Sequence, residues 1–103
     1  VEVHGVSHIT GGGFYENIPR VLPDNCRAYV DASAWQPQPL FALMAQKGGI
    51  SQTEMFSTFN MGVGMVVVVD RQDADTALAT LRANGQEAFV LGDIRGGDKG
   101  VTL

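Results

Sequence analysis

The chain is short of cysteine and of basic residues, and each shortage excludes a class of protein. Cys26 is its single cysteine and cannot build a disulfide framework, which makes the reducing cytoplasm the expected setting. Lys and Arg total 7 against 11 Asp and Glu, and they form no cluster, which argues against a nucleic-acid partner. The longest apolar run, residues 65–69, is too short to cross a membrane.

What is present suits a small folded unit. Hydrophobic residues make up 45% of the 103 residues, which is enough for one core and at most one domain. The chain begins at Val1, without Met and already in strand-like sequence. We therefore expect it to be a piece of a longer polypeptide.

Three consecutive glycines, Gly11, Gly12 and Gly13, separate a strand-like run from a helix-like run. Without a Cβ atom they allow a positive φ and let a ligand approach the main chain closely. A helix that begins there directs unpaired N–H groups into that space, which suits a phosphate or another anion. The alternative is a tight turn without a ligand. The segment is neither a P-loop, since no Lys follows, nor a dinucleotide fingerprint.

Polar residues flank this segment, and each has two interpretations. His8, at the end of the predicted strand, could transfer a proton or could hold the loop through a backbone carbonyl. Asn17 could bind a ligand or satisfy main-chain groups freed by Pro19. Arg20 could bind an anion with two N–H groups, or form an ion pair with Glu16 one helical turn earlier.

A second glycine-containing segment, residues 59–65, precedes an apolar strand. Asn60 in it could bind a ligand or serve as a turn residue. Neither His4 nor His8 has a Cys or a carboxylate at ligand spacing, so we predict no metal site. No nucleophile–base pair stands out. Any chemistry at these residues would therefore depend on positioning a phosphate, or on residues outside the chain.

The hydrophobic periodicity predicts the order β-α-β-α-α-β-α-β-β, an α/β fold with helices packed on a largely continuous sheet. Ser51 and Glu54 fit a capping box, and Asp70 is placed to cap a helix that ends before Gly85. Residues 62–69 are apolar on both faces, which is typical of a central strand. The predicted strands cover residues 1–9, 26–31, 62–69, 87–94 and 101–103, and the longer predicted helices cover residues 40–47 and 71–84.

Three stretches resemble the C-terminal region of the aminoimidazole ribonucleotide synthetase family, also called phosphoribosylformylglycinamidine cyclo-ligases. They are HITGGG at residues 8–13, ENIPRVLP at residues 16–23 and FNMGVGM at residues 59–65. Their order and separation are specific, whereas a triple glycine alone is not. The resemblance spans nearly all of residues 1–103 but only the later part of that C-terminal domain. The N-terminal ATP-binding domain would then be absent from this chain.

The resemblance implies an enzyme that closes the imidazole ring of formylglycinamidine ribonucleotide. Such enzymes use ATP and Mg²⁺, held mainly by the N-terminal domain, and release aminoimidazole ribonucleotide, ADP and phosphate. The family forms homodimers, and its C-terminal domain is a three-layer α/β/α sandwich with a mixed sheet. By this resemblance the full polypeptide is an ATP-dependent ligase of purine biosynthesis, and the fragment alone is inactive.

The resemblance also assigns residues to a cleft. It implies that one group holds a substrate or nucleotide phosphate, that a second group shapes the neighbouring wall, and that His8 is the candidate acid–base residue. The first group is His8, Thr10, Gly11, Gly12, Gly13, Asn17 and Arg20, and the second is Asn60, Gly62 and Gly64. Two alternatives stay open: a related ATP-using enzyme of the formylglycinamidine ribonucleotide synthetase or selenophosphate synthetase type, and a non-catalytic module that binds a small ligand.

Overall fold

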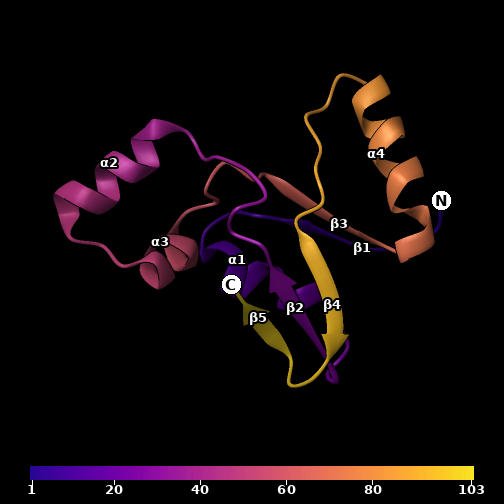
Figure 1. The fold of residues 1–103 in the computed structure, drawn as a ribbon. Helices are drawn as coiled ribbons and strands as arrows, with labels where there is room; N and C mark the ends of the chain where they lie inside the picture. The colour runs from indigo at the N-terminus through magenta and orange to yellow at the C-terminus, as the bar shows by residue number, and fades with distance from the viewer.

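A computed structural model describes all 103 residues and shows the predicted order of elements (Figure 1). None of the helices combines the length and the apolar character needed to cross a membrane. The elements are β1 (Val3–His8), α1 (Gly13–Asn17), the 3-10 helix η1 (Pro19–Val21), β2 (Cys26–Val30), α2 (Pro39–Gly48), α3 (Gln52–Thr58), β3 (Met65–Val69), the 3-10 helix η2 (Arg71–Asp73), α4 (Ala74–Ala83), β4 (Gly92–Gly96) and β5 (Gly100–Thr102).

The strands form two sheets. β1 and β3 pair antiparallel, with Val6 opposite Val67 and His8 opposite Met65. β2 is the centre of a three-stranded mixed sheet, antiparallel to β4 and parallel to β5. The α/β class and the mixed sheet are therefore confirmed. The expectation of one largely continuous sheet is wrong for this chain, because β3 pairs only with β1. The three-layer sandwich stays a prediction for the complete domain.

An aromatic cluster ties the elements together. Phe14 of α1 is fully buried, and its ring centroid lies 5.0 Å from that of Phe56 in α3 and 5.8 Å from that of Trp35. The Trp35 indole also stacks on Phe89 and donates from Nε1 to the Met61 carbonyl at 2.9 Å. Aromatic rings in contact stabilise the fold by more than the burial of their surface area alone. Trp35 is thus a loop residue anchored in the core.

Two prolines, Ser51 and Gly85 lie at the ends of helices, where their residue types favour them. α1 ends before Pro19, which has no N–H to continue the helix, and η1 begins there. Pro39 is the first residue of α2, where a missing N–H costs nothing. The Ser51 hydroxyl accepts a hydrogen bond from the Glu54 amide at 3.2 Å, and Gly85 follows α4 with a φ of +82°.

Strand β3 differs from its prediction as a central strand. Its partner β1 covers one edge only, and one face of this two-stranded sheet is open to solvent. Met65 is 59% exposed and Val67 is 37% exposed. The apolar run predicted burial on two faces, but burial requires neighbours, and the chain supplies them on one face only. The predicted strand over residues 87–94 is likewise displaced, to Gly92–Gly96.

Helix α4 begins later than predicted and packs closely on neither sheet. η2 precedes it, and Asp70 makes no side-chain cap, because its carboxylate bonds His4 instead. Figure 1 shows α4 standing apart from the other helices. One face of the helix carries apolar side chains that are only half-buried; they are Ala74, Ala77, Leu78 and Leu81.

The open face of the β1–β3 sheet should make the isolated chain self-associate, since an exposed apolar strand surface favours association. Met65→Lys should reduce that association without lowering the melting temperature. Leu40→Lys, at an equally exposed apolar position on α2, should leave it unchanged. Sedimentation velocity over a range of concentrations measures both effects. A chain that stays monomeric at high concentration would contradict the expectation.

Candidate functional site

The glycine loop turns the chain from β1 into α1. Gly12 and Gly13 have φ angles of +94° and +61°, in the left-handed region where a side chain is strained. The Gly13 amide donates to the Thr10 carbonyl at 2.9 Å and closes the turn. Two of the three glycines are therefore required by backbone conformation alone.

Packing explains the same two glycines. A Cβ atom at Gly13 would collide with the Phe56 carbonyl of α3, and one at Gly12 would collide with the Glu16 side chain. At Gly11, by contrast, φ is not in the left-handed region and a Cβ atom would meet nothing within 4 Å. The turn without a ligand accounts for Gly12 and Gly13. It gives no reason for Gly11, which is exposed at the surface of the loop.

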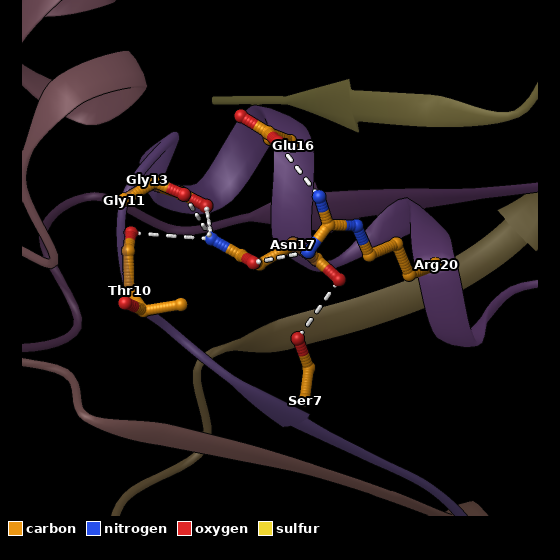
Figure 2. Close-up of polar contacts among 7 residues, drawn as sticks. All are labelled: Ser7, Thr10, Gly11, Gly13, Glu16, Asn17 and Arg20. Atoms are coloured by element: carbon orange, nitrogen blue, oxygen red, sulfur yellow. Dashed lines mark hydrogen bonds and ion pairs between the residues drawn. The ribbon is translucent and has the colours of Figure 1, made fainter.

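Asn17 holds this loop together. It is only 3% exposed, and its Nδ2 amide donates to the carbonyl oxygens of Thr10 at 3.2 Å, Gly11 at 3.2 Å and Gly13 at 2.8 Å (Figure 2). The Ser7 hydroxyl of β1 donates to the Asn17 carbonyl at 2.9 Å. Asn17 therefore serves the main chain, at the carbonyls of the loop rather than at the groups that Pro19 frees.

This network leaves main-chain donors on the outer side of the loop. Because Asn17 gathers loop carbonyls, the acceptors of the loop are directed inward. The amides of Gly11 and Gly12 donate to no atom of the chain. Successive unpaired amides around a turn can bind an anion. The geometry is therefore compatible with a phosphate at this loop.

Arg20 lies beside the loop and has partners within the chain. Its Nη2 donates to Glu16 Oε1 at 2.6 Å, and its Nη1 donates to Asn17 Oδ1 at 3.1 Å (Figure 2). The ion pair with Glu16, one of the two interpretations of Arg20, is confirmed. Both side chains are more than half exposed, so the pair is weakly held.

His8 is not brought to the loop. Side chains alternate along a strand, and Ser7 points toward α1, so His8 lies on the opposite face of the sheet, beside Met65. It is exposed and makes no hydrogen bond, and the interpretation in which it holds the loop through a carbonyl is wrong. Its proton-transfer role stays a prediction.

The second glycine segment lies next to the first. The Ile9 amide donates to the Gly64 carbonyl at 2.9 Å, which joins the two segments directly. Asn60 Oδ1 accepts from the Gly62 amide at 2.9 Å, within a turn in which Met61 and Gly62 both have positive φ. The two segments are therefore adjacent, and Asn60 has the turn role of its two interpretations. That this second segment forms the wall of a ligand cleft stays a prediction.

The sequence did not single out Ser7, although one signal pointed to it. Alternation along β1 places Ser7 on the same inward face as Ile9, and a buried hydroxyl requires a hydrogen-bond partner. Its partner is the first helix, so Ser7 fixes α1 against the strand.

His4 has carboxylate neighbours in space that ligand spacing in the sequence did not indicate. Pairing of β1 with β3 brings Asp70 Oδ1 to 3.0 Å from His4 Nε2, and Glu2 joins them with all ligand atoms within 4.8 Å. Sequence spacing could not show this, because Asp70 lies 66 positions away. All three side chains are exposed, where carboxylates commonly gather without a metal, and we assign no ion to them.

Two ionisable groups are shifted, and both lie outside the glycine loop. Hydrogen bonds from the Ser33 hydroxyl and amide lower the pKa of Asp31. A hydrogen bond to Asp93, with its negative charge, raises the pKa of Arg95.

Comparison with known proteins gives consistent matches. Residues 1–103 match the family described as AIR synthase related protein, C-terminal domain. The phosphoribosylformylglycinamidine cyclo-ligase of Alkaliphilus oremlandii (strain OhILAs) is 52% identical over 103 residues, which are 100% of this chain and 30% of that protein. The enzyme of the same name from Lachnospira eligens is 48% identical over 103 residues, again 30% of its length, and that from Shouchella clausii is 50% identical over 90 residues, 87% of this chain and 26% of that protein. The chain thus spans less than a third of these relatives.

Gly13→Ala should destabilise the fold by more than backbone strain explains. Gly49 has a φ of +62° with nothing near its missing Cβ, so Gly49→Ala measures strain alone, about 1 kcal/mol. Gly13→Ala adds the collision with Phe56, and we expect it to cost about 2 kcal/mol more. Urea unfolding of both variants gives the difference. Equal losses would mean that α3 does not constrain the loop.

Asn17→Asp should destabilise the protein strongly, because a buried carboxylate cannot donate to three carbonyl oxygens. We expect a loss of about 3 kcal/mol in the free energy of unfolding. The matched control is Asn60→Asp, since Asn60 uses only its Oδ1 acceptor, which Asp retains. That change should cost less than about 0.5 kcal/mol. A tolerated Asn17→Asp would show that the network does not hold the loop.

Proposed function

We propose that this chain is part of a phosphoribosylformylglycinamidine cyclo-ligase. The chain belongs to the AIR synthase related protein family, in which it is a C-terminal domain. The complete enzyme would close the imidazole ring of formylglycinamidine ribonucleotide with ATP, giving aminoimidazole ribonucleotide, ADP and phosphate. Identity of about half over the whole chain supports this assignment. The enzyme would act in the cytoplasm, in purine biosynthesis.

Within that enzyme, we assign the glycine loop to a phosphate of the substrate or of the nucleotide. The observation that carries this proposal is the pair of unpartnered amides at Gly11 and Gly12, on a loop whose carbonyls Asn17 holds inward. Thr10 is exposed beside them, and its hydroxyl makes no bond within the chain. Arg20 lies beside them in an exposed ion pair with Glu16, and would supply positive charge on exchange of that partner. Gly62 and Gly64, in the turn that Asn60 closes, form the neighbouring wall.

The loop fits a phosphate but not a divalent cation. Mg²⁺ prefers oxygen ligands such as carboxylates. Glu16 is the one carboxylate at the loop, and Arg20 already neutralises it. We therefore place the main ATP and Mg²⁺ site in the N-terminal domain of the same polypeptide, which would also form the homodimer. Residues 1–103 alone would then be inactive.

In this proposal, a catalytic role of His8 depends on where the substrate binds. It is a candidate to transfer a proton, but it lies on the sheet face opposite α1. The role requires that the substrate reach the open face of β1–β3, where other parts of the polypeptide would meet it. Orienting a bound phosphate, by contrast, needs only the loop itself.

Gly11→Val in the complete enzyme tests the phosphate assignment. A Cβ atom there meets nothing within 4 Å, and we expect a branched side chain to block approach to the loop amides. We expect the KM for formylglycinamidine ribonucleotide or for ATP to rise by roughly tenfold or more. Gly96→Val, at another glycine with open space, is the control. Gly12→Val would be ambiguous, because its positive φ strains the backbone in any case.

The melting temperatures of the Gly11 and Gly96 variants should match that of the unmodified enzyme. If Gly11→Val leaves both KM values unchanged, the loop does not bind either phosphate.

A further inference from the structure

Glu16 is a carboxylate placed against the loop to which we assign a phosphate. It lies one helical turn after Gly12, and helical side chains lean toward the N-terminal end. A Cβ atom at Gly12 would collide with the Glu16 carboxylate and would lie 2.6 Å from Glu16 Cβ. The space in front of the Gly12 main chain therefore already holds a negative charge.

The same carboxylate neutralises the cation beside the loop. Glu16 Oε1 accepts from Arg20 Nη2 at 2.6 Å, while Arg20 Nη1 is bound to Asn17 Oδ1. An anion that arrives at the Gly11 and Gly12 amides thus meets repulsion from Glu16 and finds Arg20 occupied. Because the ion pair is exposed, it can exchange partners at small cost.

We propose that Glu16 is a specificity-determining residue that reserves this loop for dianionic phosphate groups. A phosphate dianion attracts Arg20 more strongly than Glu16 does, and Glu16 turns into solvent as the ligand binds. A carboxylate ligand carries no more charge than Glu16 and does not displace it. The bond from Nη1 to Asn17 keeps the guanidinium beside the loop during the exchange. This inference rests on the proposed phosphate role of the loop.

The test is an NMR titration of the complete polypeptide, labelled with isotope-enriched glycine. Inorganic phosphate and acetate are added separately, and the amide resonances of Gly11 and Gly12 are followed. In the unmodified protein, phosphate should shift both resonances and acetate neither. In Glu16→Gln, phosphate should bind more tightly by roughly threefold to fivefold, the scale of an exposed ion pair, and acetate should now bind. Gln can still accept from Arg20, so the melting temperature should not change.

Asp75→Asn is the matched control, because it removes one negative charge on α4, which stands apart from the loop. It should alter neither titration. Weaker or unchanged phosphate binding in Glu16→Gln would overturn the inference, and would mean that Glu16 only orients Arg20. Phosphate shifts in the unmodified protein would still uphold the phosphate role of the loop. If neither protein responds to phosphate, both proposals fail.

Discussion

The Asn17 carboxamide is the interaction on which the glycine loop depends. A tight turn from a strand into a short helix leaves carbonyl oxygens without helical partners, and burying them unpaired would be costly. The two N–H groups of one buried amide are shared among three carbonyl oxygens of the loop, of which that of Thr10 also accepts from the Gly13 amide. The Ser7 hydroxyl bonds the same residue from β1, and Arg20 bonds its remaining side-chain oxygen. Strand, loop and helix are thus fixed relative to one another through one side chain.

Much of the fold was predictable because its signals are local. Proline at positions 19 and 39 fixed where helices break and begin, and Ser51 fixed a cap, since each acts on its own backbone neighbours. The turn from a strand into a helix at Gly11, Gly12 and Gly13 was predictable for the same reason. The family resemblance added the enzyme class that we propose, which spacing and periodicity alone did not indicate.

The features that were not predicted depend on contacts between distant segments. The apolar run of β3 does not reveal whether two neighbouring strands are present or one. The choice of Asp70 between capping η2 and bonding His4 depends on the β1–β3 register. At the site, the sequence indicated Asn17 but not the carbonyl oxygens that it bonds, because the fold of the loop decides which of them lie near it. The opposite orientations of Ser7 and His8 follow from the alternation of side chains along β1.

The contact between Gly13 and the Phe56 carbonyl links the loop to α3, and no change of side-chain rotamer can relieve it. Main chain lies against main chain there, so a displacement of α3 is transmitted to Gly13 rather than absorbed by side-chain motion. Sequence changes within Gln52–Thr58 that alter the position of this helix would therefore change the affinity for the phosphate that we propose at the loop, without contact to that phosphate. Natural variation in α3 is expected to accompany variation in the glycine loop as a correlated pair.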